Sequence, residues 1–232
     1  MAQLRSYVVV RPFRPHIYTV QELGQILRAL HRRSETSRHR VHWLGAEEIV
    51  FLLYACGMRM SEPLKLRLQD VDLQERVLFI ACTKFYKQRW IPLGAAACRR
   101  LAAYLQERNR AWPERCAAGD PFFLNLRGRA YSRPAVGAVF RGVVDELGIR
   151  SRGTGLPRLH DLRHSCAVHR LYKWYADGAD VQNRLPLLTT YLGHAKIVST
   201  QAYLHLTEDL LRQAGRGFQA VFERVVPSPR DS

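Results

Sequence analysis

Two histidines, an arginine and a tyrosine follow one another near the C-terminal end of the sequence. His160 and Arg163 lie three residues apart in HDLRH, at the start of a predicted helix. This spacing places both side chains on one helix face, one turn apart. His194 follows in LGH, and Tyr203 lies nine residues after it. Such side chains can together bind an oxyanion, move a proton and supply a nucleophile.

The ordered pattern HxLRH, LGH and a tyrosine nine residues on resembles the C-terminal half of the tyrosine recombinase (phage integrase) family, over roughly residues 19–210. The resemblance implies that family's catalytic-domain fold, mainly α with a small β-hairpin or sheet (α+β). It also implies a site-specific recombinase that cuts and rejoins DNA through a 3′-phosphotyrosyl intermediate, with neither metal nor other cofactor. The residues it implies as catalytic are Arg59, Lys84, His160, Arg163, His194 and Tyr203.

The implied reaction explains why each of these residue types is needed. A tyrosine phenol has a pKa of about 10, so roughly one in a thousand is ionised at neutral pH; His160 is the candidate to accept its proton. Negative charge gathers on the nonbridging phosphate oxygens, which the permanently charged Arg59 and Arg163 are predicted to clamp. Lys84 is the candidate acid for the leaving 5′-oxygen, and His194 would add a hydrogen bond to the phosphate.

Arg59 lies in a tight connection between two predicted helices. The first covers the apolar segment 46–56 and stops at Gly57, a residue type that commonly follows a helix end. A short helix follows, which Ser61 is predicted to cap. Glu62 is close enough in sequence to orient Arg59, and is therefore expected to support the site.

Two short segments rich in β-formers, 77–82 and 89–93, predict a β-hairpin with Lys84 and Lys87 near its tip. An exposed basic turn is the alternative for these lysines. The family places a catalytic lysine on such a hairpin, and Lys84, the first lysine of T-K-x-x-K-x-R, is the closer match. Phe85 stands where family members often have glycine.

Other helices and loops complete the predicted catalytic domain. Thr19 and Glu22 form a capping box that starts the first helix. Segments 94–109 and 134–147 read as helices, and the basic run 31–40 reads as a solvated loop, with a phosphate contact as the alternative.

We expect a basic N-terminal arm over residues 1–18, the catalytic domain over 19–210, and a C-terminal helix and tail over 211–232. Phosphate contacts position a duplex without reading its sequence. The basic side chains outside the catalytic set that are predicted to make such contacts are Arg150, Arg152, Arg158 and Lys87.

The charge balance narrows the partner. The chain of 232 residues has 36 Lys and Arg against 20 Asp and Glu, a net charge of +16, which favours phosphate polyanions or anionic membranes. It has no apolar run of membrane-spanning length and no signal-peptide core at its start. Its 5 scattered cysteines suggest free thiols in a reducing compartment. We therefore expect a cytoplasmic protein that binds double-stranded DNA and no membrane.

HDLRH also allows a metal-site interpretation. His160 and His164 have the i,i+4 spacing of zinc ligands in HExxH proteases, and Asp161 stands where Glu would be. A further histidine, His169, lies on the same predicted helix. Arg163 among the ligands and the lack of an obvious acidic third ligand argue against zinc, so no metal ligand is predicted. In the recombinase interpretation, His164 supports the site.

Two alternatives share the fold. One is a DNA-binding protein that does no chemistry, against which the intact catalytic set argues. The other is a type IB topoisomerase-like enzyme that relaxes DNA without exchanging partners. Sequence alone leaves the topoisomerase alternative open.

Recombinases of this kind usually carry a separate helical domain ahead of the catalytic one, whereas about 18 residues precede the first predicted helix here. We hypothesise either a catalytic-domain-only grip on DNA, beside a partner recombinase, or a truncated product. Family analogy suggests a homo- or hetero-oligomer on DNA, a tetramer joining two duplexes.

Overall fold

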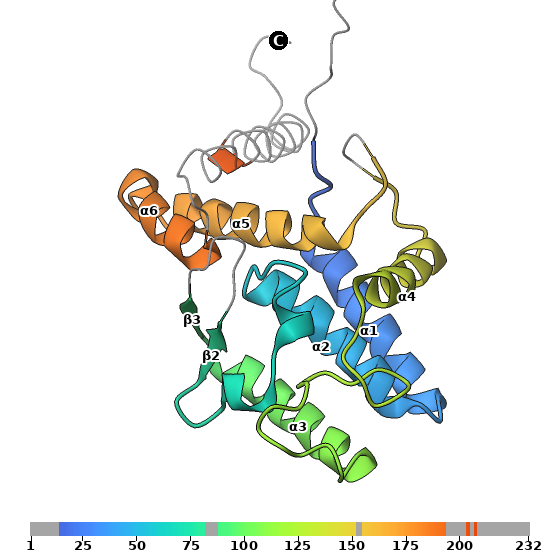
Figure 1. Cartoon of the computed structure of the whole chain (residues 1–232). Coiled ribbons are helices and arrows are strands. Elements are labelled where there is room, and N and C mark those ends of the chain that lie inside the picture. Colours follow the sequence, from blue (N-terminus) through green and yellow to red (C-terminus); the bar gives the residue numbers. More distant parts are fainter. Residues whose placement is uncertain (1–13, 82–87, 152–154, 194–202, 205–206, 208–232) are drawn as a thin grey trace, which may run out of the picture.

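The computed structural model describes residues 14–81, 88–151, 155–193, 203–204 and 207 (Figure 1). In chain order the elements of this part are α1 (Val20–Thr36), α2 (Arg40–Ala55), the 3-10 turns η1 (Pro63–Lys65) and η2 (Leu68–Asp70), β1 (Val71–Asp72), β2 (Val77–Ile80), β3 (Arg89–Pro92), α3 (Ala95–Ala111), α4 (Arg133–Glu146), α5 (Leu159–Ala176) and α6 (Val181–Leu192). The prediction of a mainly helical α+β fold with a small sheet is confirmed.

The start of α1 follows the predicted capping box. The Thr19 hydroxyl accepts a hydrogen bond from the Glu22 backbone N at 3.1 Å, and the Glu22 carboxylate accepts one from the Thr19 backbone N at 2.8 Å. The prediction of a loop over residues 31–40 is wrong for residues 31–36 and 40, and only 37–39 lie outside a helix. α1 runs on to Thr36 and α2 begins at Arg40. Most side chains of the run are exposed as expected, because a helix can present them to solvent while Ser34 faces the core.

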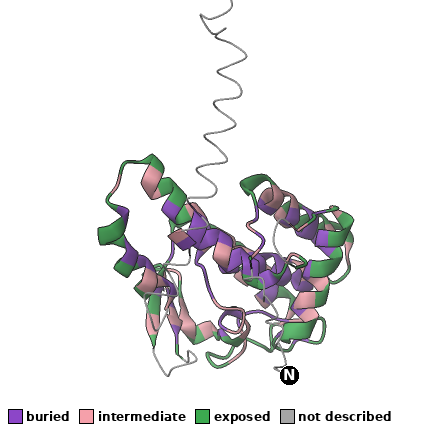
Figure 2. Cartoon of the chain, turned by 90° about the horizontal axis from the view of Figure 1, so that it is seen from above, coloured by how far each residue is buried: buried purple, intermediate pink, exposed green. Residues whose placement is uncertain are grey.

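α2 is the central helix of the domain. It packs against α1, α3 and α5, and its side chains at Ile49, Leu52 and Leu53 are almost completely buried. Burying one such aliphatic side chain contributes roughly 1.5–3 kcal/mol. Figure 2 shows buried residues along the central helices and exposed ones around the rim. The connection that follows α2 therefore starts from a fixed point in the core.

The predicted hairpin is present. β2 and β3 pair antiparallel, with Ile80 opposite Arg89 and Leu78 opposite Ile91. The inward side chains of Leu78, Ile80 and Ile91 are buried. β1 adds a third strand beside β2, too short to be recognised from alternation. The hairpin tip, residues 82–87, lies outside the described residues.

A second hydrophobic cluster joins α5, α6 and Tyr203. Its fully or nearly fully buried members include Val168 and Leu171 of α5 and Leu188 and Leu192 of α6. In Figure 1, α5 lies across one end of α2, and α6 packs beside the C-terminal half of α5. This cluster brings the end of α6 to the end of α2.

The start of the described chain is tied to α5. Tyr18 is fully buried, and its backbone N donates a hydrogen bond to the Ser165 hydroxyl at 2.8 Å. The predicted boundary between the arm and the catalytic domain thus falls next to a core residue. None of the described helices has the length and apolar character needed to span a membrane.

Candidate active site

Arg59 is held by Glu62 in the turn after α2. The Arg59 backbone N donates to Glu62 Oε2 at 2.7 Å, and its Nη1 donates to Oε1 at 3.2 Å. The predicted contact between these residues is therefore present. The predicted Ser61 cap is wrong. Glu62 takes the cap position of η1, which has no side-chain cap, since its carboxylate bonds back to Arg59.

Arg163 is buried on α5, with 2% of its surface exposed. Its Nη1 donates to the Gly57 carbonyl and its Nη2 to the Leu192 carbonyl, both at 2.6 Å. Burial first, and then the neighbouring charge of Arg59, lower the pKa of this guanidinium to about 10. It therefore remains charged at neutral pH.

The two guanidiniums are accommodated by the carbonyl ends of two helices. Arg163 takes carbonyls that follow α2 and end α6, and Arg59 Nη2 donates to the Gly193 carbonyl just after α6. Helix C-termini carry partial negative charge, which stabilises cations placed there. Two like charges can therefore lie side by side before any anion arrives.

The helix ends require glycine at both points. Gly57 has φ +58°, and a Cβ there would meet Leu192 Cδ2 at 2.5 Å. Gly193 has φ +69°, and a Cβ there would lie 2.9 Å from Arg89 Nη1. Glycine adopts this left-handed backbone without a steric penalty. It also lets the arginines approach the backbone of α6's end.

The tyrosine lies against α5. Tyr203 is 5% exposed, and its Oη is 2.9 Å from His164 Nδ1. Burial raises the pKa of the phenol, while the charge and hydrogen bonding of Arg163 act in the opposite direction. The phenol is therefore protonated at rest and lies beside both a cation and an imidazole.

His160 and His164 form an edge-to-face pair with ring centroids 4.8 Å apart. Loss of hydration and then the charge of Arg163 lower the pKa of His160. Burial and then the neighbouring His160 lower the pKa of His164 to about 4. Both rings are thus neutral at pH 7 and able to accept a proton. The buried carboxylate of Asp161 stabilises the first turn of α5, where it accepts a hydrogen bond from the Arg158 backbone N at 3.0 Å.

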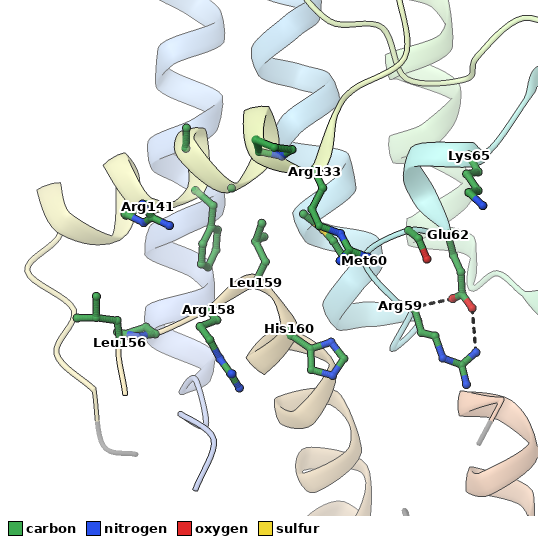
Figure 3. A pocket seen from close by; sticks show the side chains of 16 residues that line it. Arg59, Met60, Glu62, Lys65, Arg133, Arg141, Leu156, Arg158, Leu159 and His160 are labelled. Carbon is green, nitrogen blue, oxygen red and sulfur yellow. Dashed lines mark hydrogen bonds and ion pairs between the residues drawn. The ribbon is translucent and has the colours of Figure 1, made fainter. Parts of the chain in front are cut away.

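A cleft of about 1390 Å³ opens beside these residues (Figure 3). Arg59 and His160 point into it from the turn after α2 and from α5. Among its described lining residues, Glu62 is the one acid, and its side chain is 1% exposed. The basic side chains that line the cleft are Arg59, Lys65, Arg133, Arg141, Arg158 and His160. Such a surface suits a phosphodiester backbone.

The structure brings most of the predicted site together. The predicted residues that meet around the end of α6 and the start of α5 are Arg59, His160, Arg163 and Tyr203, with Glu62 and His164. The predicted residues Lys84, Lys87, Arg152 and His194 lie outside the described residues.

Of the described residues that were predicted to contact phosphate, one lines the cleft and one does not. Arg158 lines the cleft, with its Nη2 2.8 Å from Asp161 Oδ1. Arg150 is exposed past the end of α4 and does not line the cleft. Sequence reasoning missed Arg133 and Arg141, because nothing in the pattern of α4 shows which of its faces borders the cleft.

Arg89 was also missed. It is the first residue of β3, and its side chain is 12% exposed. A signal was present, since alternation along β3 places Arg89 on the same face as the buried Ile91. A cation on an inward strand face calls for a buried partner.

The histidines of the metal-site alternative have other contacts. His164 bonds to Tyr203, and His169 Nδ1 is 2.9 Å from the Tyr54 hydroxyl. In the part of the chain that the structure describes, His, Cys, Asp and Glu form no group of three or more that could hold a metal ion.

Comparison with known proteins gives a consistent result. The profile of the phage integrase family matches residues 17–209. The integrase/recombinase y4rB of Sinorhizobium fredii is 32% identical over 90% of this chain and 67% of its own length. Tyrosine recombinase XerD of Bifidobacterium longum is 33% identical over 85% of this chain and 60% of its own length. The chain thus spans about two thirds of these relatives.

Solved structures agree on the fold. The crystal structure of XerA recombinase superposes with a TM-score of 0.64 at 24% identity, over 88% of this chain and 65% of that one. XerH site-specific recombinase, in a post-cleavage complex with its palindromic difH substrate, gives a TM-score of 0.67 at 22% identity, over 88% and 54%.

Proposed function

Because the chain belongs to the phage integrase family, we propose that it is a tyrosine-type site-specific DNA recombinase. One observation carries the proposal: a buried tyrosine, Tyr203, lies 2.9 Å from an imidazole and beside the charged Arg163, next to a basic cleft into which Arg59 points. A nucleophile, proton acceptors and two phosphate-binding cations are thereby assembled from segments distant in sequence.

The proposed cleavage step is an attack by the Tyr203 oxygen on a DNA phosphorus. A bond forms between this oxygen and phosphorus while the bond from phosphorus to the 5′-oxygen breaks. Arg59 and Arg163 hold the nonbridging oxygens, where preorganised donors are typically worth on the order of 3 kcal/mol each. The leaving oxygen takes a proton from Lys84, and His194 adds a hydrogen bond. Both residues enter as proposals from the sequence pattern.

The phenol proton has two candidate acceptors. His164 Nδ1 lies 2.9 Å from the phenol oxygen, and the His160 ring packs edge-to-face against the His164 ring. We assign the first contact with the phenol to His164. His160, which faces the cleft, stays the proposed base once the phosphate is bound. A 5′-hydroxyl of another strand then attacks the phosphotyrosine and restores both the phenol and the phosphodiester, so neither ATP nor metal is consumed.

Double-stranded DNA is the proposed substrate, and the cytoplasm the proposed place of action. Structural relatives solved on DNA include XerH with difH and a lambda integrase dimer on a core site. We propose that this chain likewise acts as a homo- or hetero-oligomer on DNA, with a partner recombinase as one form. Exchange between two duplexes, rather than relaxation of one, is the proposed outcome.

Covalent trapping tests the proposal. The protein is mixed in EDTA with nicked duplex fragments from the flanks of its own gene, and SDS-resistant protein–DNA adducts are sought. We expect adducts with the wild type and none with Tyr203→Phe. The matched control is Tyr191→Phe, since Tyr191 packs between the two hydrophobic clusters; it should form adducts.

The outcomes separate the alternatives. Absence of any wild-type adduct, with DNA binding intact, would contradict the proposal and favour a catalytically silent DNA-binding protein. An adduct that forms only when metal is supplied would contradict the metal-free step, and one that survives in Tyr203→Phe would contradict the assigned nucleophile. A second duplex added to the reaction should yield joined strands. Relaxation without joined product would instead favour topoisomerase-like activity.

A further inference from the structure

Arg89 binds the same carboxylate that orients Arg59. Its Nη1 donates to Glu62 Oε1 and its Nη2 to Glu62 Oε2, both at 2.8 Å. This is the two-pronged geometry that gives the strongest arginine–carboxylate pairs. Arg89 comes from β3, directly after the hairpin tip, whereas Glu62 comes from the turn after α2. The pair therefore connects the hairpin to the turn that carries Arg59.

Among the residues that the structure describes, the hydrogen bonds of the Glu62 carboxylate all go to one of two arginines. Oε1 accepts from Arg89 Nη1 at 2.8 Å and from Arg59 Nη1 at 3.2 Å. Oε2 accepts from Arg89 Nη2 at 2.8 Å and from the Arg59 backbone N at 2.7 Å. The side chain is 1% exposed, so water does not compete for these positions. The direction of Arg59 is thus set by a carboxylate that Arg89 fixes.

Charge gives Arg89 a second effect. Burial alone would raise the pKa of Glu62, but the hydrogen bonds and charge of Arg89, followed by the Arg59 backbone, lower it. The charged groups that act on Glu62 are Arg89 of β3, Arg59 of the turn and Arg163 of α5. The two shortest side-chain contacts of Glu62 are those with Arg89, at 2.8 Å, whereas the contact with Arg59 Nη1 is 3.2 Å. The guanidinium of Arg59 is therefore less tightly paired with Glu62 and can bind another anion.

We propose that Arg89 is a positioning residue for strand cleavage: as the counter-ion of Glu62, it keeps that carboxylate oriented and leaves Arg59 free to bind the DNA phosphate. The inference rests on the proposed function. Without Arg89, the buried carboxylate of Glu62 would follow one of two courses. It would form a full ion pair with Arg59, or it would take up a proton and no longer hold Arg59 in place. Both changes weaken the phosphate clamp.

The test compares single-turnover cleavage of a nicked duplex, at saturating DNA, in wild type, Arg89→Gln, Arg89→Lys, Glu62→Gln and the double variant. Misplacing a catalytic group by about 1 Å can reduce a rate on the order of 100-fold, so we expect a 10- to 100-fold loss in Arg89→Gln. Arg89→Lys, which keeps the charge but not the fork, should recover part of the rate. Arg76→Gln, which removes an exposed charge from the same sheet region, is the matched control.

A pH profile separates positioning from simple loss of structure. In Arg89→Gln, the carboxyl of Glu62 should titrate within the working range, which adds a pH-dependent limb to the cleavage rate. That limb should vanish in the Arg89→Gln/Glu62→Gln double variant, whose rate loss should be less than the product of the two single losses. Should Arg89→Gln fail to fold, Arg89→Lys and Glu62→Gln alone carry the comparison.

Cleavage by Arg89→Gln at the rate of Arg76→Gln, or strictly multiplicative losses, would overturn the inference. Its failure is distinguishable from failure of the proposed function by a titration without DNA. The carboxyl carbon signal of Glu62, identified by its absence in Glu62→Gln, is followed by NMR in wild type and Arg89→Gln. We expect a higher pKa in the variant. An unchanged pKa would overturn the inference even if no variant cleaves DNA.

Discussion

The imidazole of His164 lies 2.9 Å from the phenol oxygen of Tyr203, in a setting that lowers its pKa to about 4. In the unfolded chain a histidine titrates near 6.5. Between these values the unfolded chain binds a proton that the folded protein does not. Burial of this one residue therefore affects both stability and the proposed chemistry. Folding favours the neutral ring, which is the form that can accept a proton from the phenol.

The residue-scale prediction concerns His164→Gln. The free energy of unfolding of the wild type should fall as the pH falls from about 6.5 towards 4, and this variant should flatten the slope. Urea unfolding at a series of pH values measures it. His39→Gln, which removes an exposed imidazole at the start of α2, is the control. An unchanged slope in His164→Gln would contradict the pKa of this ring.

The same variant tests the order of the proton acceptors. If His164 makes the first contact with the phenol during cleavage, His164→Gln should slow adduct formation at least as much as His160→Gln. Cleavage by His164→Gln at the wild-type rate would leave His160 as the acceptor.

At the scale of elements, the site depends on where two helices end. The carbonyls that follow α2 and close α6 accept hydrogen bonds from Arg163 and Arg59. α6 is held there by the cluster it shares with α5. Gly193 closes α6 in the left-handed conformation, and a Cβ there would lie 2.9 Å from Arg89 Nη1 and 3.2 Å from Arg59 Nη1. The helix end is thus part of the anion site as well as a structural terminus.

The element-scale prediction compares two glycines. Gly193 and Gly148 have similar backbones, with φ +69° and +62°, but only a Cβ at Gly193 would meet heavy atoms within 4 Å. Alanine in this backbone region costs roughly 1–2 kcal/mol, so both Gly193→Ala and Gly148→Ala should lower the free energy of unfolding by about that much. Adduct formation should fall on the order of 10-fold or more only in Gly193→Ala. Equal cleavage in both would contradict the role given to this helix end.

At the scale of the whole molecule, the net charge of the chain is +16, and cations outnumber acids among the described residues that line the cleft. The cleft is lined by Lys65 of η1 and by Arg133 and Arg141 of α4. These cations lie on the same cleft as Arg59 and His160. Charge of one sign along a concave surface raises the local concentration of a polyanion. The cleft therefore has the electrostatics expected for gripping a duplex beside the tyrosine.

The molecule-scale prediction is a steep salt dependence of duplex binding. Six to ten phosphate contacts lose roughly 10³- to 10⁵-fold in affinity between 50 and 200 mM salt. Fluorescence anisotropy measures it. Arg133→Ala or Arg141→Ala should each reduce the logarithmic slope by about one, whereas Arg115→Ala, an exposed cation that does not line the cleft, should not. A flat salt response would contradict the DNA-binding interpretation.

The sequence by itself determined the contacts between residues that are close in the chain. The Thr19–Glu22 capping box, the hairpin of β2 and β3, and the contact of Arg59 with Glu62 each involve residues close in the chain or strictly alternating. The ordered motif from His160 to Tyr203 likewise identified the family. The basic run 31–40 misled because exposed charged side chains fit the outer face of a helix as well as a loop; most of them are exposed, yet residues 31–36 belong to α1.

Contacts between distant segments were decided only by the tertiary structure. Glu62 and Arg89 are 27 residues apart, and Tyr203 and His164 are 39 apart, so no spacing rule connects them. Which face of α4 presents Arg133 and Arg141 to the cleft depends on how α4 packs, and the carbonyls that hold Arg163 depend on where α2 and α6 end. Sequence names the side chains that can do the chemistry, whereas packing of the hydrophobic core fixes their neighbours and hence their charge and direction.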